Sequence, residues 1–327
     1  MYFGLSEDQI FFQDNVKKFL EDQLTLDTVR KITEGEDDLA KEELHKGLIN
    51  LGINNILVPE EHGGLGLDLL FATAVSQSLG EGVATLPFLG PYILAPTAIK
   101  YGASDSQKEK LFADMSQNLI NFGIGFSEYF GSRDSSGLNI SDNKVTGKTL
   151  FVLDTDFASH VMIADNKGQI GIVSLDSNDI EMIDLTTVDK TRTYKEMHFS
   201  DTPIEILDKT KSSSFAIEMA LDAGRIIAAA DSLGASQAMI NKAVEYSKER
   251  KQFNRVIGSF QAVKHMCAEM AAELEPCYSL VWHAAHCFDD SSEDARLMAC
   301  LAKSHISEVS KMVSKKSYRS TWRHGVY

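Results

Sequence analysis

The sequence predicts an α+β protein with an N-terminal α-helical domain at residues 1–120, a middle antiparallel β domain at 121–208 and a C-terminal antiparallel helical bundle at 213–327. Two observations carry this prediction. The spacing of apolar residues changes from a helical period to a strand period near residue 121 and changes back near residue 213. Helices that precede and follow a block of strands, without alternating with them, favour separate α and β layers over a parallel βαβ sheet.

Residues 1–120 show helical patterns that are separated by clear breaks. Ser6 is a candidate N-cap, because Gln9 follows it at the spacing of a capping box before an apolar run. The segment PEEHGGLGLD contains glycines that cannot continue a helix. A helical pattern resumes at Leu69, and Gly80 is a natural stop for it.

Residues 121–208 contain short runs rich in β-branched and aromatic residues, such as VTGKTLFVLD and QIGIVSLD. Asn-Lys, Asp-Asn and Lys-Gly pairs separate these runs and act as turn signals. This spacing is typical of an antiparallel sheet or a small barrel. The sequence KTKSSS at 209–214 then predicts a polar hinge.

From Phe215 onward the pattern is helical, with apolar residues at three- and four-residue steps. Three long helices that pack as an antiparallel bundle are expected. Their apolar faces contain Ile226, Ala230, Leu233, Ile240 and Val244 in the first helix, Phe260, Val263, Cys267, Met270 and Leu274 in the second, and Ala295, Met298, Ala302, Ile306, Val309 and Val313 in the third.

The composition is that of an acidic globular chain. Its 327 residues carry a formal net charge of −15. An acidic surface repels phosphate backbones, so nucleic acid is not an expected partner, and an anionic ligand would need locally placed Arg, Lys or helix N-termini. The four cysteines form no CxxC pair, so we expect small buried hydrophobic side chains and no metal site.

The N-terminal segment MYFGLSEDQIFF does not have the pattern of a secretory signal, in which basic residues precede an apolar stretch. No apolar run in the sequence is long enough to span a bilayer. We therefore expect a cytoplasmic protein with no membrane span.

One segment after the first bundle helix combines cations with amide and ring side chains. Lys248, Arg250 and Lys251 lie at the end of that helix, and a new helix is expected to begin near Ser259. An arginine can grip a pyrophosphate with two hydrogen bonds, and a helix N-terminus adds oriented N–H groups.

Gln252 and Gln261 can bind amide or hydroxyl groups, and Phe253 can stack on a ring. From the residues alone, the alternative is a solvated charge cluster in which Phe253 and Phe260 belong to the core.

Several strings resemble the acyl-CoA dehydrogenase family, and together they cover nearly the whole chain. LGINNILVPEEHGGLGLD is similar to the family segment LGxxxxxVPEExGGxG, and LGEGVATLPFLGPYILAP and YGASDSQKEKLFADM follow in the family's order. The longest match runs from DAGRIIAAADSLG to RKQFNRVIGSFQ. The resemblance implies the α–β–α fold described above, FAD as cofactor and an acyl-CoA thioester as substrate.

In the family, the residues that match Arg250, Gln252, Phe253 and Gln261 bind the adenine dinucleotide part of FAD, which usually lies mainly in a neighbouring subunit. The resemblance therefore also implies a homo-oligomer or a hetero-oligomer with a second subunit of this type, and an electron acceptor such as an electron-transfer flavoprotein. Asn254 stands where the family usually has Gly, and asparagine tolerates the left-handed backbone that a turn requires.

The middle segment departs from the family. The motif TEPxAGSD is matched only loosely by Ser127 and Glu128, and the motif GxKxxxTN is matched by GKTLFVLD. Phe151 takes the place of the aromatic in the second motif, whereas Leu153 replaces the threonine that contacts the flavin in relatives. A leucine cannot form that hydrogen bond. The resemblance thus implies cofactor contacts from Ser127 and Phe151, with one contact missing.

No catalytic base is identified. Relatives place the glutamate that removes the α-proton either directly before an Arg of the bundle or near the C-terminus. Gly224 stands before Arg225, and the second location lies beyond residue 327. Asp222 and Asp231 are nearby carboxylates, but a helical Asp is usually solvated or capping.

The last eleven residues, SYRSTWRHGVY, do not resemble the family helix at this location. A one-base shift of a compatible coding sequence gives ATEVHGGMGFT, which contains the HGGxGFT string that the family has there. The resemblance therefore predicts a frameshift near Lys315–Lys316 and an incomplete bundle.

Three functions fit these observations. The first is α,β-dehydrogenation of an acyl-CoA, with a partner supplying the missing groups. The second is a non-catalytic subunit that completes the FAD or acyl-CoA pocket of a partner. The third is an inactive truncated product. The segment VATLPFLGPYILAP resembles the subgroup associated with mixed oligomers, bulky ring-bearing thioesters and lipid or steroid catabolism.

Overall fold

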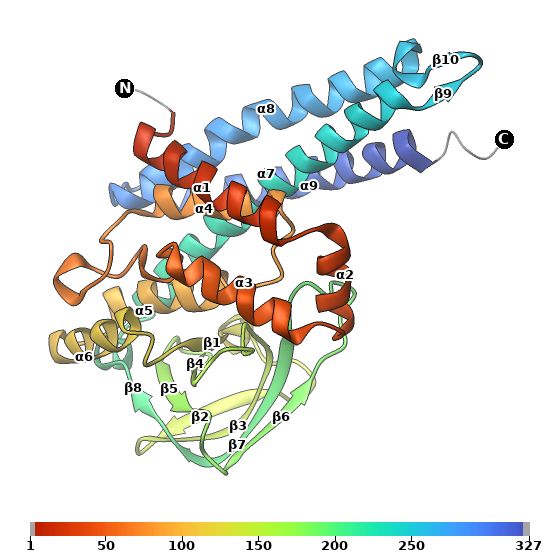
Figure 1. The fold of residues 1–327 in the computed structure, drawn as a ribbon. Coiled ribbons are helices and arrows are strands. Elements are labelled where there is room, and N and C mark those ends of the chain that lie inside the picture. The colour runs from red at the N-terminus through yellow and green to blue at the C-terminus, as the bar shows by residue number, and fades with distance from the viewer. Residues whose placement is uncertain (1–3, 323–327) are drawn as a thin grey trace. The chain divides into compact units, whose positions relative to one another are not determined.

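The computed structural model describes residues 4–322 and confirms the predicted α+β class (Figure 1). The N-terminal helices are α1 (Glu7–Gln23), α2 (Leu26–Glu34), α3 (Asp38–Asn50), α4 (Leu69–Glu81), α5 (Ala95–Gly102), which follows a π-helical turn at Gly90–Leu94, and α6 (Asp105–Ser116). The strands are β1 (Phe122–Gly125), β2 (Gly137–Ser141), β3 (Lys144–Leu153), β4 (His160–Ala164), β5 (Ile170–Ser174), β6 (Ile180–Asp184), β7 (Tyr194–Pro203) and β8 (Glu205–Ile206). The C-terminal elements are α7 (Phe215–Glu249), the short strands β9 (Lys251–Gln252) and β10 (Arg255–Val256), α8 (Gln261–Asp289) and α9 (Ala295–Trp322).

The chain forms two compact units. One contains the described parts of Met1–Thr25, Leu69–Ala84 and Arg225–Tyr327, and the other contains Leu26–Asp68 and Thr85–Gly224. These units do not follow the three consecutive segments of the sequence. The domain limits 1–120, 121–208 and 213–327 therefore stay a prediction. None of the helices within residues 4–322 is both long and apolar enough to cross a membrane.

The first unit is helical apart from the short β9–β10 hairpin. The predicted capping box begins α1, where the Ser6 backbone N–H donates to Gln9 Oε1 at 2.8 Å and the Gln9 N–H donates to Ser6 Oγ at 3.3 Å. Helix α4 packs closely on α7, because a Cβ at Gly80 would lie 2.1 Å from the carbonyl oxygen of Asp231. Gly80 therefore lies inside α4, one residue before its end, and its role is close packing.

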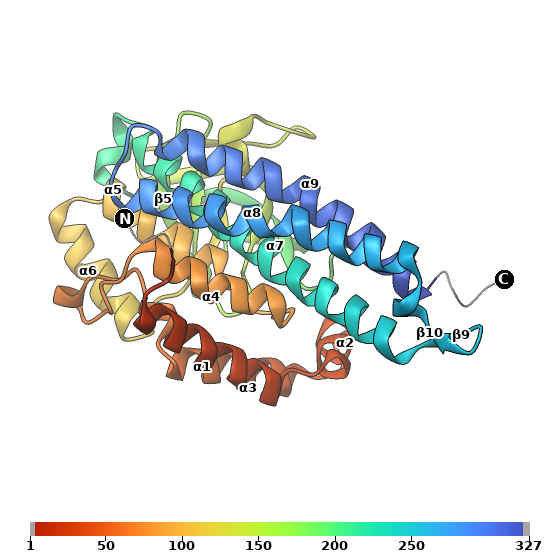
Figure 2. The same ribbon diagram turned by 90° about the horizontal axis from the view of Figure 1, so that it is seen from above.

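The three long helices of this unit run side by side (Figure 2). Tyr278 of α8 donates a hydrogen bond to Gln237 of α7 at 3.0 Å, and the Ser317 hydroxyl of α9 donates to the carbonyl of Met239 at 3.0 Å. Residues 317–322 continue α9, so these six residues are helical although they do not resemble the family segment at this location. Residues 323–327 lie outside the described part of the chain, and the frameshift remains a prediction.

The second unit is built on an eight-stranded sheet with the order β6-β7-β3-β1-β4-β5-β8, and β2 pairs with β3. All strand pairs are antiparallel except β1 with β4, which pair in parallel from Phe122 with His160 to Gly125 with Ile163. The β2–β3 hairpin intervenes between these two strands, so the chain re-enters the sheet in the same direction. The purely antiparallel prediction is wrong at this one pair.

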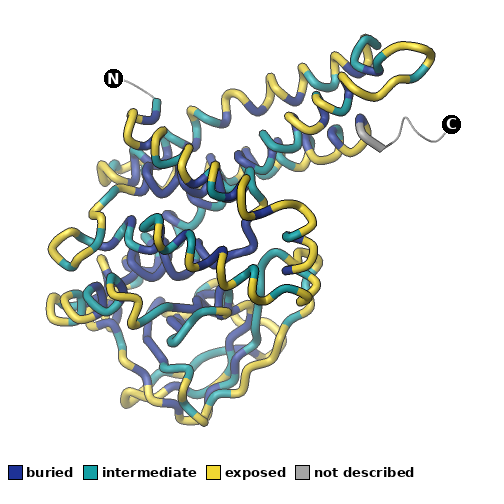
Figure 3. Tube along the Cα trace, viewed as in Figure 1, coloured by how far each residue is buried: buried dark blue, intermediate teal, exposed yellow. Residues whose placement is uncertain are grey.

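Buried and more exposed residues follow one another along the strands (Figure 3), and the buried ones form two separate apolar cores. Along β4, Met162 faces a core formed with α5 and α6, whereas Val161 and Ile163 face a core formed among the strands.

Candidate functional site

The turn between α7 and α8 carries four of the six residues predicted to bind the cofactor. Helix α7 ends at Glu249, and the chain then forms a two-stranded hairpin in which Gln252 pairs with Arg255. The two residues at its tip, Phe253 and Asn254, have φ values of 51° and 59°. A two-residue hairpin turn requires this left-handed backbone, so Asn254 can replace the glycine of the family.

The side chains of this turn are available to a ligand. Phe253 is 87% exposed, and Arg250 is exposed at the end of α7. Gln252 is half-buried, and Gln261 is exposed as the first residue of α8. The alternative placement of Phe253 in the core is therefore wrong.

Phe260 is half-buried beneath Arg255, whose guanidinium carbon lies 4.0 Å from the ring centre. Beside it, a cavity of about 400 Å³ lies between the end of α7 and the start of α8. Val244, Val263 and Cys267 line it together with Lys248 and Lys264, and burial raises the pKa of the Cys267 thiol. The sequence analysis singled out Lys248 but neither Lys264 nor the cavity.

The other two predicted residues, Ser127 and Phe151, lie in the second unit. Phe151 belongs to β3, is 43% exposed and has a φ of 55°, which is unusual for a bulky side chain. The Ser127 hydroxyl donates to the carbonyl oxygen of Leu150 at 2.5 Å. Ser127 therefore lies against the backbone that precedes Phe151.

A buried carboxylate follows directly after Leu153. Asp154 is 5% exposed, and its Oδ2 accepts a hydrogen bond from the N–H of Gly90 at 2.8 Å. Burial raises the pKa of Asp154 to about 6, while the positive charge of Arg192 and the Gly90 N–H act in the opposite direction. Sequence analysis missed this group, because LFVLD looked like an ordinary strand end.

Gly224 lies where the family resemblance predicts one of the two base positions. A Cβ at this residue would lie 2.8 Å from Cδ2 of Leu94, so the backbone of α7 approaches a leucine side chain here. Asp222 is buried and Asp231 is half-buried. Neither of these two carboxylates stands at position 224 itself, where the family resemblance predicts a base.

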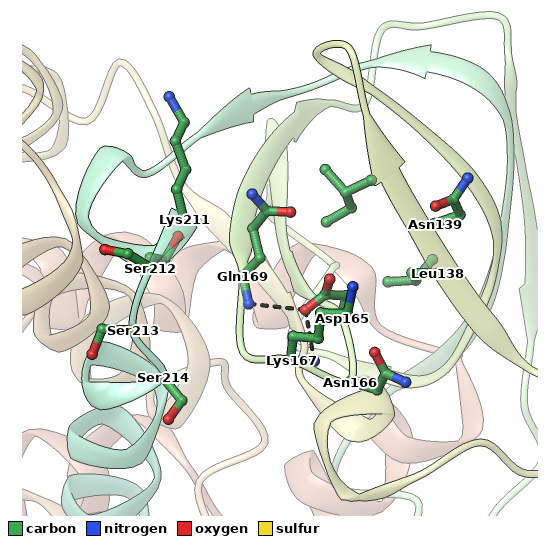
Figure 4. Close-up of a pocket in the computed structure, with 12 residues that line it drawn as sticks. Leu138, Asn139, Asp165, Asn166, Lys167, Gln169, Lys211, Ser212, Ser213 and Ser214 are labelled. Carbon is green, nitrogen blue, oxygen red and sulfur yellow. Dashed lines mark hydrogen bonds between the residues drawn. The ribbon is translucent and has the colours of Figure 1, made fainter.

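A polar cavity of about 630 Å³ opens at the start of α7 (Figure 4). On one side lie Ser212, Ser213 and Ser214, which lead into the first turn of α7, and on the other lies the β4–β5 turn with Asn166 and Lys167.

In that turn, Asp165 Oδ1 accepts hydrogen bonds from the backbone N–H groups of Lys167 and Gln169, both at 2.9 Å. Lys211 also lines the cavity, and its ammonium group lies 2.8 Å from Asp208. Lys167, Lys211 and the N-terminal end of α7 thus lie at one cavity, which the carboxylate of Asp165 also lines. Cations and a helix N-terminus are groups that can bind an anion.

Comparisons with known proteins agree with this architecture. Residues 6–118 match the model of the acyl-CoA dehydrogenase N-terminal domain, and residues 215–317 match that of the C-terminal domain. A 3-(aryl)acrylate reductase from Clostridium sporogenes is 28% identical over 291 residues, which cover 81% of this chain and 76% of the relative.

Subunit CarC of the caffeyl-CoA reductase-Etf complex from Acetobacterium woodii is 24% identical, over 100% of this chain and 90% of the relative. In the crystal structure of the ChsE4-ChsE5 complex from Mycobacterium tuberculosis, one chain has the same fold, with a TM-score of 0.86 at 19% identity, over 100% of this chain and 90% of that one.

Proposed function

The chain belongs to the acyl-CoA dehydrogenase family, and we propose that it is a flavoprotein subunit for α,β-dehydrogenation of an acyl-CoA thioester. The observation that carries this proposal is the exposed turn between α7 and α8. It combines a cation, an exposed ring and the N-terminus of a 29-residue helix.

The residues of this turn fit the diphosphate and adenine of FAD. Arg250 would bind the diphosphate with two hydrogen bonds. The first backbone N–H groups of α8 would also attract the negatively charged diphosphate. Phe253 would provide a ring face for the adenine, while Gln252 and Gln261 would bind polar edges. When bound, FAD supplies the hydride acceptor for the reaction.

On the flavin side the fit is partial. Phe151 presents an exposed ring beside Ser127, which supports contact with a planar group. Leu153 offers no hydrogen bond to it, and Gly224 offers no carboxylate to a substrate. The residues that the family resemblance assigns to cofactor binding are thus exposed or partly exposed, whereas Leu153 and Gly224 lack the polar groups that the reaction would use.

The cavity at the start of α7 is suited to the phosphates of coenzyme A. Lys167 and Lys211 line it, and the dipole of the 35-residue helix α7 favours an anion at this end. The serine hydroxyls at 212–214 would bind phosphate or ribose oxygens.

The missing polar groups also favour a partner. One relative is a subunit of a reductase–Etf complex, and a chain of like fold occurs in the ChsE4-ChsE5 complex. We accordingly propose that this subunit works in an oligomer of such chains, and that an electron-transfer flavoprotein is its electron acceptor. A subunit that only completes the pocket of a partner is the second candidate, and Leu153 with Gly224 favours it.

The proposal is tested by titrating the purified chain with FAD, alone and mixed with a second acyl-CoA dehydrogenase-type subunit of the same organism. Arg250→Ala should weaken FAD binding by about tenfold or more, the loss of one charge-assisted pair of hydrogen bonds. Arg319→Ala, on the exposed face of α9, is the matched control and should bind FAD as the parent does. Equal FAD affinity of Arg250→Ala and the parent would refute the assignment.

A further inference from the structure

Strand β3 bulges where it presents Phe151. Thr149 pairs with Met197 and Val152 pairs with Lys195, so Leu150 and Phe151 together face the single residue Glu196 of β7. The extra residue leaves the ladder, and Phe151 adopts a left-handed backbone that bulky side chains rarely take. Such a conformation persists only where the surrounding structure enforces it.

Two side chains enforce it by binding the residue before Phe151. The N–H of Leu150 donates to Glu128 Oε1 at 3.3 Å, and the Ser127 hydroxyl donates to the carbonyl of Leu150 at 2.5 Å. Both main-chain groups of Leu150 are thus bound by neighbouring side chains of the short helical turn at Ser127–Phe130.

The carboxylate of Glu128 is the centre of this arrangement. It is 2% exposed, and its second oxygen accepts a hydrogen bond from the Ser136 hydroxyl at 2.7 Å. Ser136 Oγ in turn accepts from the N–H of Arg133 at 2.9 Å. One buried carboxylate therefore ties the loop at 131–136 to the bulge of β3.

We propose that Glu128 is a positioning residue, which holds the β3 bulge so that the ring of Phe151 faces outward as a platform for the planar ring of the cofactor. The role of Phe151 as a platform rests on the proposed function. The clamp, by which we mean the hydrogen bonds of Glu128 and Ser127 with Leu150, does not. Burying a carboxylate costs free energy of folding unless its oxygens accept hydrogen bonds. In Glu128, one of these hydrogen bonds comes from the backbone N–H of Leu150 and so fixes the local backbone conformation.

The clamp is tested in the cofactor-free chain. Phe151→Trp introduces an indole at position 151, and its quenching by acrylamide is obtained by subtracting the tryptophan fluorescence of the parent chain. With Glu128 present the indole should be readily quenched. Adding Glu128→Ala should change the quenching constant at least about twofold, because the bulge loses its anchor. Glu128→Gln keeps an acceptor for Leu150 and should restore the original value, whereas Glu181→Ala on exposed β6 should leave it unchanged. Unchanged quenching in the Glu128→Ala chain would overturn the clamp.

The platform is tested by FAD titration of Glu128→Ala, Phe151→Ala and the double variant. Loss of one ring-stacking contact should weaken binding by about tenfold in each single variant. The double variant should be no weaker than Phe151→Ala, because both changes remove the same contact. Additive losses, or none, would overturn the platform. If the parent binds no FAD, the proposed function fails, and the quenching result alone decides the clamp.

Discussion

The turn between α7 and α8 and the end of β3 differ in what their residues do for the fold. In the turn, Arg250 and Phe253 are exposed, and their backbone is shaped by a short hairpin. Near the end of β3, the carboxylates of Glu128 and Asp154 are buried and bind backbone N–H groups. The proposed flavin contact at position 153 is the apolar Leu153. This contrast supports the proposal that the chain keeps groups for cofactor binding and lacks groups for the reaction. Each prediction below tests this contrast.

The largest effect is expected from placing a carboxylate at position 224. Gly224→Glu needs only a shift of the flexible end of Leu94, which lies 2.8 Å from the new Cβ. A positioned general base contributes about 10²–10⁴-fold, so acyl-CoA-dependent reduction of an electron acceptor should rise by about 10²-fold or more over the parent loaded with FAD. Gly224→Gln is the matched control, because an amide cannot take the proton. Equal rates for Glu and Gln would show that position 224 does not face the substrate.

The next effect concerns stability at the end of β3. The folded state raises the pKa of Asp154 from 3.8 to about 6, so between these pH values it holds a proton that the unfolded chain releases. The free energy of unfolding therefore falls as pH rises through this window. Asp154→Asn removes the penalty and should stabilise the chain at pH 7.5 by up to about 3 kcal/mol, at 1.36 kcal/mol per pKa unit.

His45 provides an internal check on that prediction. Burial lowers its pKa to about 4, so its contribution to stability rises with pH up to the unfolded value near 6.5. In the parent, the free energy of unfolding therefore falls with pH because of Asp154 and rises with pH because of His45. Urea unfolding of Asp154→Asn between pH 4.5 and 7.5 should show a steeper rise than the parent. Parallel pH profiles would contradict the assignment of a buried, titrating Asp154.

A smaller effect is expected at the cavity in Figure 4. Replacing both Lys167 and Lys211 by Ala should weaken coenzyme A binding about tenfold at low salt, and the difference should shrink in high salt because the charges are partly solvated. Calorimetric titration measures this change. Lys144→Ala, an exposed lysine at the start of β3, is the control and should bind as the parent does. If the double variant binds coenzyme A with the affinity of the parent, this cavity does not bind the coenzyme A part of the thioester.

The smallest effect is predicted for the stability of the turn. Phe253→Ala should change the free energy of unfolding by less than about 0.5 kcal/mol, because the ring is 87% exposed. FAD affinity should nevertheless fall. A destabilisation of several kcal/mol in thermal or urea unfolding would instead assign Phe253 to the fold and would break the contrast between the two regions.

Local signals in the sequence were sufficient for several features. The Ser6 cap and the end of α7 follow from side-chain chemistry within a few residues. The turn at Phe253 and Asn254 was expected from the family resemblance, and the left-handed φ values of both residues agree with it. The period of apolar residues was likewise sufficient for the α+β class, because burial on one face dictates that period.

Long-range features could not be predicted in this way. The parallel pairing of β1 with β4, the clamp of Glu128 on Leu150 and the contact of Asp154 with Gly90 each join residues far apart in sequence. Gly80 looked like a helix stop, since only the partner helix reveals its close contact with Asp231.

The most direct test of the account measures acyl-CoA-dependent reduction of an electron acceptor by the FAD-loaded chain, alone and mixed with a second acyl-CoA dehydrogenase-type subunit. Leu153 and Gly224 predict a rate near background for the chain alone. They also predict substrate-dependent turnover in the mixture, which Arg250→Ala should lower. Robust turnover by the isolated chain would contradict the claim that this subunit retains the groups for cofactor binding but not those for the reaction.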